Sequence, residues 1–176
     1  MPMNNAAHGF PALSGTGNTG NPSLLERNWK ARCRRGNQAF VLGNHAVAES
    51  HYVEAVSLAR VAVGMAQRAG DAVPEEKLER WLSMWVIGHL NLSDLYARAE
   101  PERALGVAFS AYERMVECLH DARVAARVHR AFLRHLRHLL DGLMDLMKRT
   151  GIPERCAARI RTKAQALALG YWNAWT

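Results

Sequence analysis

The chain has 176 residues, of which 49% are hydrophobic, and a chain of this size can form one domain that buries roughly 70% of its unfolded surface without a metal or disulfide. Its three cysteines are odd in number, lie far apart and form no CxxC pair, which argues against a disulfide framework or a thiolate zinc site and favours a reducing, cytoplasmic setting. Lys and Arg outnumber Asp and Glu by 23 to 16, and the whole excess of +7 falls within residues 120–163, which favours an acidic partner.

Residues 1–22 precede the first predicted helix. They consist mainly of Asn, Gly, Ala, Pro, Ser and Thr, so they cannot bury enough apolar surface to offset the entropy of ordering, and we expect a flexible tail. One helical domain is expected over residues 23–176. The first charged residue is Glu26, so the N-terminus lacks the positive flank of a secretory signal. No uncharged apolar segment approaches the ~20 residues that span a bilayer, and we expect no membrane association.

Six helices are predicted from residue 23 onward, and no stretch has the alternating pattern of a strand. The first begins at Ser23-Leu24-Leu25-Glu26, a capping box in which the Ser hydroxyl and the Glu carboxylate satisfy each other's free backbone N–H groups. Short connections rich in Gly, Asn and Pro separate the helices, so neighbours run antiparallel and pair into three hairpins. The predicted bounds are 23–43, 46–69, 74–98, 101–120, 122–149 and 153–169.

The first hairpin carries a distinctive spacing, which reads Gly36-Asn37-x-x-Phe40-x-x-Gly43-x-His45-x-x-Ala48-x-x-x-Tyr52-x-x-Ala55. It resembles a tetratricopeptide repeat (TPR), in which the Gly-Asn-x-x-Phe helix packs against a second helix that presents a small residue, an aromatic and another small residue. Residues that fit a degenerate second copy are Leu92, Leu95, Tyr96, Ala104, Ala108 and Ala111. The resemblance implies an all-α fold, a TPR-like right-handed stack of about three antiparallel hairpins, stretched beyond the TPR period of about 34 residues. A non-repeat helical bundle is the alternative.

The resemblance also implies a surface that binds other proteins, because repeat scaffolds usually do so and rarely carry out chemistry. In TPR proteins the first helices of the hairpins line a concave groove, and the Asn that matches Asn37 often bonds the backbone or terminal carboxylate of a peptide. The residues implied on the first helix are Arg27, Lys30, Arg34 and Asn37. The lysine of a carboxylate clamp is replaced here by Cys33, and the alternative for the basic residues is a solvated face.

The third helix is apolar on nearly every side, which predicts that it is packed by several neighbours in the middle of the fold. Trp81 and Trp85 lie at helical spacing within it, and such aromatic residues are core more often than ligand platforms. His89 falls in the same stripe, and we expect a hydrogen-bonded interior histidine.

The fifth helix separates an apolar face from a polar one. The polar face begins with a basic stripe of Arg127, Arg130, Arg134 and His138. If it shares a concave surface with the first helix, the two would form an anion-seeking groove. His138, Asp141 and Asp145 cluster at helical spacing, with His135 and His129 nearer the apolar side. Arg134 falls in the same cluster, so we predict salt bridges there rather than a metal or cofactor.

These patterns favour a non-enzymatic adaptor or chaperone that holds an acidic or extended protein segment. No nucleotide-binding glycine loop, HExxH helix or nucleophile elbow is present. Nucleic-acid binding through residues 120–163 is the alternative, although Phe132 is the one aromatic residue there able to stack on bases. A secretion-type chaperone is a third reading, by analogy of fold. Trp172 and Trp175 near the C-terminus either cap the stack or form a homodimer contact.

Overall fold

Five α-helices make up the described part of the computed structural model, which covers residues 23–69, 72–121 and 124–151 and the single positions Arg155, Ala158, Thr162 and Ala166. The helices are α1 (Leu24–Val41), α2 (His45–Ala69), α3 (Glu75–Tyr96), α4 (Pro101–His120) and α5 (Ala126–Arg149). No strand occurs in these residues, so the all-α prediction is confirmed. The tail at 1–22, Trp172, Trp175 and nearly all of the predicted sixth helix lie outside the described residues.

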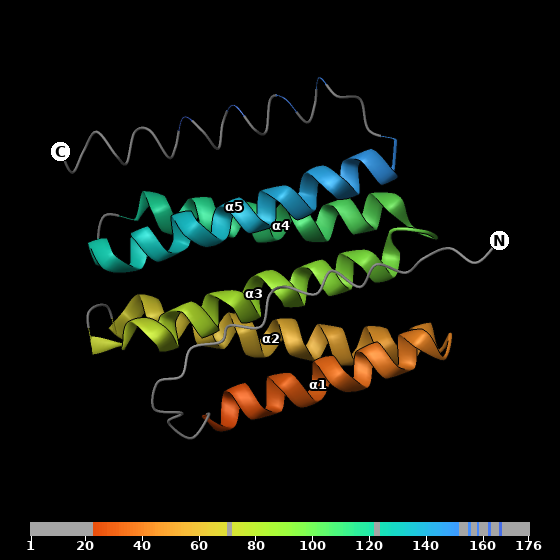
Figure 1. Cartoon of the computed structure of the whole chain (residues 1–176), viewed down its shortest axis with the longest axis horizontal. Coiled ribbons are helices and arrows are strands. Elements are labelled where there is room, and N and C mark those ends of the chain that lie inside the picture. Colours follow the sequence, from red (N-terminus) through yellow and green to blue (C-terminus); the bar gives the residue numbers. More distant parts are fainter. Residues whose placement is uncertain are drawn as a thin grey trace.

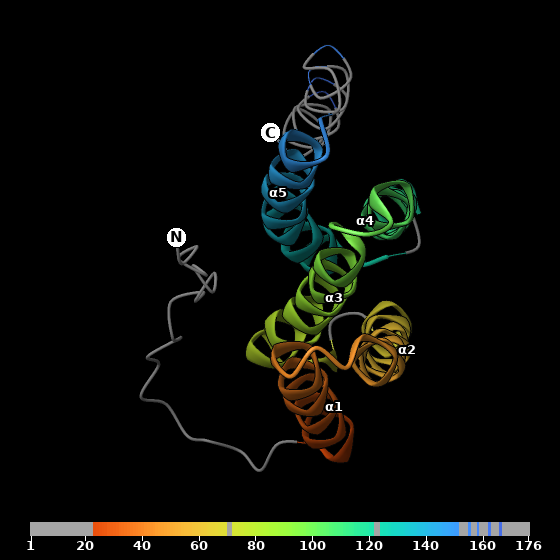
Figure 2. The same ribbon diagram turned by 90° about the vertical axis from the view of Figure 1, so that its right-hand side faces the viewer.

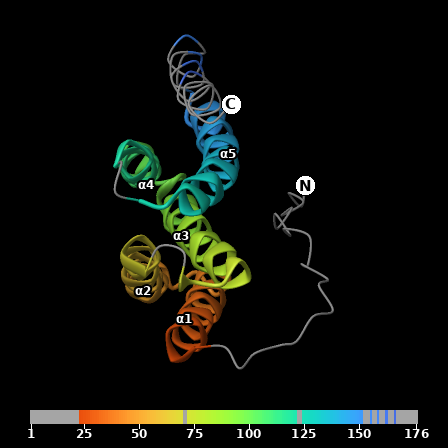
Figure 3. The ribbon, with the colours of Figure 1, turned by 90° about the vertical axis from the view of Figure 1, so that its left-hand side faces the viewer.

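The helices form two layers. Consecutive helices run antiparallel (Figure 1), and α1, α3 and α5 lie side by side in one layer while α2 and α4 form the other (Figures 2 and 3). Each helix contacts the next, and α3 also contacts α1 and α5 within its own layer. Among the described helices α3 therefore touches all four others, as its apolar circumference predicts.

The apolar side chains of α3 are buried as expected. Trp81 and Trp85 are only 2% and 3% exposed, so both belong to the core rather than to a ligand platform. The Nδ1 of His89 donates a hydrogen bond to the carbonyl of Trp85 at 2.8 Å. Burial lowers the pKa of His89 to about 4, so the ring is neutral at pH 7 and the predicted interior histidine is confirmed.

Two clusters of buried side chains form the core, and each draws on all five helices. The larger contains Trp29, Trp85 and Phe132, and the smaller contains Tyr52 and Tyr96. Because burial of apolar surface is the main favourable term in folding, at roughly 25 cal/mol per Å², every described helix is stabilised through the same two clusters.

The predicted packing of α1 against α2 is confirmed in detail. A Cβ added to Gly36 would lie 2.6 Å from Cε1 of Tyr52, so a larger residue at this crossing would force the ring to shift. Tyr52 is buried, and so are Ala48 and Ala55, about one turn to either side of it. The Tyr52 hydroxyl donates a hydrogen bond to Oδ1 of Asn37 at 2.7 Å. Small residues thus let the two helices approach while the ring fills the gap between them.

The predicted capping box is half formed. The Ser23 hydroxyl accepts a hydrogen bond from the backbone N–H of Glu26 at 3.3 Å. The Glu26 carboxylate does not return the contact to Ser23, because it is only 3% exposed and lies 3.5 Å from Nε of Arg80 on α3. The predicted turns at Gly43 and Gly151 are confirmed, since both residues have a φ of 73°, in the left-handed region that favours glycine.

Candidate functional site

The basic stripe of α1 points away from α2. At about 100° per residue, Arg27, Lys30 and Arg34 lie on the opposite side of α1 from Arg32, and Arg32 forms an ion pair with Glu54 of α2 at 2.6 Å. All three stripe cations are exposed. Within the part of the chain that the structure describes, none of them forms an ion pair. They form a positive strip on the outer surface of the layer made by α1, α3 and α5.

Asn37 lies at the C-terminal end of this stripe and also stabilises the packing of α1 against α2. Its Oδ1 accepts the hydrogen bond from the Tyr52 hydroxyl, so the carboxamide helps to fix the ring that fills the α1–α2 crossing. The side chain is nevertheless exposed, and its NH₂ group has two donors. Asn37 can therefore hold Tyr52 with one end and donate to a bound backbone carbonyl or carboxylate with the other.

One arginine of the basic stripe of α5 is paired with α3. Arg134 pairs with Glu75 at 3.1 Å and also with Glu79, and Nε2 of His135 lies 2.7 Å from the second carboxylate oxygen of Glu79. Burial alone would raise the pKa of Glu79, but hydrogen bonds from Arg134 and His135 outweigh it and hold that pKa below its usual range. Burial lowers the pKa of His135 despite its acidic partner, so neutral His135 donates to the carboxylate at pH 7.

The far end of α5 repeats this arrangement. Arg149 lies 2.6 Å from Asp94 of α3 and 2.9 Å from Asp145 on its own helix, which confirms the predicted salt bridging for Asp145. The α3 carboxylates thus neutralise an arginine of α5 near each end of the helix pair. The two predicted stripes therefore differ, since no cation of the α1 stripe has such a partner within the described residues. Helix α3 lies between α1 and α5 (Figure 2).

The other predicted residues of α5 lie in three settings. Arg127 is partly buried and donates to the backbone carbonyl of Val73. Arg130 is exposed, and His138 is exposed with its ring centroid 6.1 Å from that of His135. His129 is buried, with Nε2 3.1 Å from the carbonyl oxygen of Cys118, as its apolar position predicts. Among the described residues no three potential metal ligands come together.

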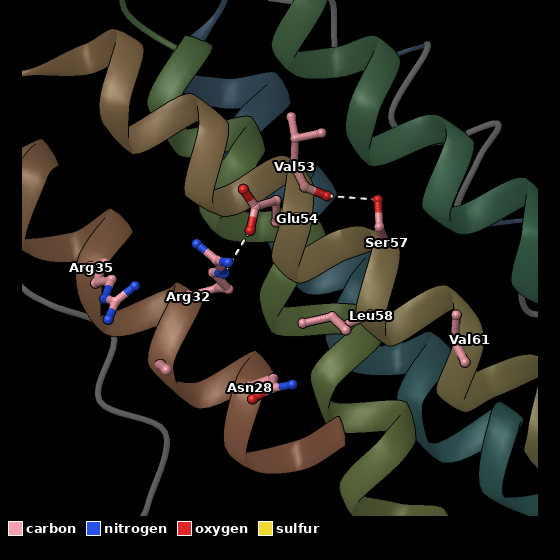
Figure 4. A pocket seen from close by; sticks show the side chains of 9 residues that line it. Asn28, Arg32, Arg35, Val53, Glu54, Ser57, Leu58 and Val61 are labelled. Carbon is pink, nitrogen blue, oxygen red and sulfur yellow. Dashed lines mark hydrogen bonds and ion pairs between the residues drawn. The ribbon is translucent and has the colours of Figure 1, made fainter. Parts of the chain in front are cut away.

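A pocket that sequence reasoning missed lies between α1 and α2 (Figure 4). It has a volume of about 520 Å³ and is lined by Asn28, Ala31, Arg32, Arg35, Val53, Glu54, Ser57, Leu58 and Val61. It opens away from α3, because Ala31 and Arg35 lie on the other side of α1 from Trp29, whose indole adjoins Gly88 of α3. The available signal was the spacing of Val53, Ser57 and Val61, four residues apart on a side of α2 that the repeat pattern leaves unassigned.

One family model matches the chain. It is described as "Protein of unknown function (DUF2753)" and matches residues 27–172, a span that includes the basic stripes and the pocket. No curated protein and no solved structure matches the chain. Of the helices that the structure describes, none is both long and apolar enough to cross a membrane.

Proposed function

This chain belongs to the DUF2753 family, which is described as being of unknown function, and from its geometry we propose that it is a non-enzymatic, TPR-like protein-interaction module. It serves as an adaptor or chaperone in the cytoplasm and binds an acidic, extended segment of another protein. The close packing of Gly36 against Tyr52 and the alternation of helices between two layers support a TPR-like stack. In such a stack the first helices of the hairpins form the binding surface, which corresponds here to α1, α3 and α5.

The observation that carries this proposal is the uncompensated charge of α1. Arg27, Lys30 and Arg34 are exposed and have no ion pair within the described residues, whereas Arg134 and Arg149 on the same layer are paired with α3. A charge-assisted hydrogen bond contributes about 1.5–3 kcal/mol when shielded from water and well under 1 kcal/mol when exposed. Useful affinity at this stripe therefore requires several carboxylates at once, which an extended acidic segment supplies.

Charge reversal on α1 tests the proposal. We expect Arg27→Glu/Arg34→Glu to weaken binding of a fluorescein-labelled, Asp- and Glu-rich 12-residue peptide by about tenfold or more, which corresponds to ~1.4 kcal/mol. The matched control is Arg68→Glu/Arg98→Glu, which changes net charge equally at exposed residues that form no ion pair among the described ones. Anisotropy titrations at several ionic strengths give the affinities. Equal weakening in both variants would mean that net charge, rather than the α1 stripe, attracts the peptide.

Affinity capture from a cell lysate extends the test to natural partners. Proteins retained by the wild-type chain and by the control, but lost with Arg27→Glu/Arg34→Glu, are the expected clients. Mass spectrometry of the retained fractions identifies them, and acidic segments should be common to them. A set of retained proteins that is unchanged by the α1 variant contradicts the assignment of this surface.

Nucleic-acid binding is the second candidate, and one observation favours it. Arg130, Arg137 and Lys148 of α5 are exposed and form no ion pair within the described residues. Pairing of Arg134 and Arg149 with α3 removes two cations from this surface, which reduces the number of phosphates it can neutralise. Filter binding of duplex and single-stranded DNA and RNA at low ionic strength tests the idea. Retention that disappears in Arg130→Glu/Arg137→Glu would replace the protein-binding proposal.

A further inference from the structure

The first hairpin carries the exposed apolar surface of the described residues. Every large hydrophobic side chain that is strongly exposed there belongs to α1, α2 or the turn between them: Leu24, Val41, Leu42, Val47, Val53, Val61 and Met65. Within the described residues, helices α3, α4 and α5 have none. Single exposed hydrophobic residues are common on proteins, whereas exposed apolar residues that lie together on one surface indicate a contact site.

The exposed side chains are ordered along the two helices. On α2, the exposed Val47, Val61 and Met65 and the partly buried Leu58 recur at helical spacing on the edge toward α1, over a length of about 27 Å at 1.5 Å per residue. On α1 and at the cap that follows it, the facing positions are Leu24, Asn28, Ala31, Arg35 and Leu42. We call these two rows, with the pocket between them, the outer face of the first hairpin.

The shape of this face suits a helix. Two packed antiparallel helices leave a groove into which a third can lay its side chains, and α3 contacts both α1 and α2 from the other side. The outer face is likewise formed by α1 and α2, but no described helix lies on it. Its pocket of about 520 Å³ is open at the middle of the groove. A length of about 27 Å corresponds to five turns of an α-helix.

The charge of this face indicates that a molecule bound there carries negative charge. Arg32 is neutralised by Glu54 at 2.6 Å. Arg35, which lines the same pocket, is exposed and forms no ion pair with any described residue. Figure 4 shows the Arg35 side chain apart from the pair that Arg32 makes with Glu54. An occupant with a carboxylate beside its apolar stripe would complete this pattern.

We propose that the outer face of the first hairpin docks an acidic amphipathic α-helix of a partner protein. Its apolar stripe covers Val53, Leu58 and Val61, and one of its carboxylates pairs with Arg35. This site goes beyond the proposed function, because it lies on a different side of α1 from the Arg27 stripe and takes a helix rather than an extended segment.

Two synthetic 18-residue peptides of the same composition test the proposal against the full-length chain. One places Leu at helical spacing with Glu on both flanks, and the other is a scramble with no apolar stripe. We expect the helical peptide to bind at least about tenfold more tightly by isothermal titration calorimetry, since covering two valines is worth more than a tenfold change. Circular dichroism of the complex should show a gain of helix.

Surface variants assign the binding to this face. Val53→Ser/Val61→Ser and, separately, Arg35→Glu should each weaken the helical peptide by about tenfold, while Arg98→Glu should change it by less than about twofold. All four positions are exposed, and thermal unfolding checks that each variant remains folded. Arg27→Glu/Arg34→Glu should retain helical-peptide binding within about threefold while losing the extended acidic peptide, so the two proposals can fail separately.

Four results would overturn the proposal. Equal binding of the scrambled peptide would contradict a site for an amphipathic helix. Helical-peptide binding that neither Val53→Ser/Val61→Ser nor Arg35→Glu weakens would contradict its location on this face. If light scattering showed a dimer that Val53→Ser/Val61→Ser converts to a monomer, the face would be the interface with a second copy of the chain. Tighter peptide binding by Phe10→Ser/Leu13→Ser, which alters the main apolar residues between Met3 and Ser23, would show that the chain's own N-terminal segment covers the face.

Discussion

Replacing Gly36 with Ala tests whether the α1–α2 crossing is as tight as the structure indicates. The added Cβ would lie 2.6 and 2.7 Å from two ring carbons of Tyr52, whereas carbon atoms in contact normally lie about 3.5–4.0 Å apart. The ring must therefore move by about 1 Å. It has little room, because Tyr52 is 4% exposed and its hydroxyl is held by Asn37 at 2.7 Å.

The size of the effect follows from two opposing contributions. Overpacking in a well-packed core costs about 1–3 kcal/mol, and Ala in place of a mid-helix Gly contributes about 0.5–1 kcal/mol of stability. We expect Gly36→Ala to lower the free energy of unfolding by about 1–2 kcal/mol. For a chain of this size the corresponding fall in Tm is about 2–8 °C. Urea denaturation followed by circular dichroism measures the change.

Gly106→Ala is the matched control, because Gly106 also lies within a helix and a Cβ there meets nothing within 4 Å. This variant should gain about 0.5–1 kcal/mol. In a Tyr52→Val background, where the ring is gone, Gly36→Ala should become neutral or stabilising, which gives a coupling energy of about 1–3 kcal/mol. If Gly36→Ala stabilises the wild-type chain as much as Gly106→Ala does, the reasoning about a tight crossing is wrong.

Three further predictions concern the interior and the α3–α5 contact. Between pH 7 and 4 the unfolded chain protonates His89 while the folded chain, with its pKa of about 4, does so much less, so stability should fall by about 3 kcal/mol. Urea titrations across this range should show a shallower pH slope for His89→Gln, and an unchanged slope would contradict the buried neutral ring. Arg134→Ala should cost up to about 1 kcal/mol at low salt and less in 1 M NaCl, whereas Arg130→Ala should change stability by less than about 0.5 kcal/mol; equal losses would remove the role of the α3 pairing. Gly142→Ala should cost less than about 1 kcal/mol, because its Cβ meets the end of the flexible, partly buried Leu90 side chain at 2.6 Å, and a loss in Tm as large as that of Gly36→Ala would show that Leu90 cannot move aside.

The local packing of the first hairpin could be predicted because its signals are close together in sequence. The spacing of Gly36, Ala48, Tyr52 and Ala55 falls on two adjacent helices, and the periodicity of each helix fixes which side chains face the partner. The helix bounds followed from the same kind of local evidence, to within two residues for α1 through α4. The role of Glu26 was predicted wrongly, because the capping-box pattern depends only on residues within one helical turn. In the structure its carboxylate pairs instead with Arg80 of α3.

The candidate surfaces were less predictable, since they depend on which helices become neighbours. Arg134 and Arg149 appear in sequence as free cations of a basic block, but they meet α3 carboxylates about 55 residues away. Arg35 and Val61 belong to no sequence motif. Their shared position became apparent only from the pocket that α1 and α2 form between them. The periodicity of one helix shows which face is polar, but it does not show whether a neighbouring helix neutralises that face.

The position of α3 has a consequence for how the chain folds. In a stack of helical hairpins, each hairpin is stabilised by its own packing and by its interfaces with the neighbouring hairpins. Here α3 contacts α1, α2, α4 and α5, and its two tryptophans are enclosed by side chains from several of them. A truncated chain that ended after α3 would lose the side chains of α4 and α5 that cover those indoles. We therefore expect the five described helices to fold as a single unit.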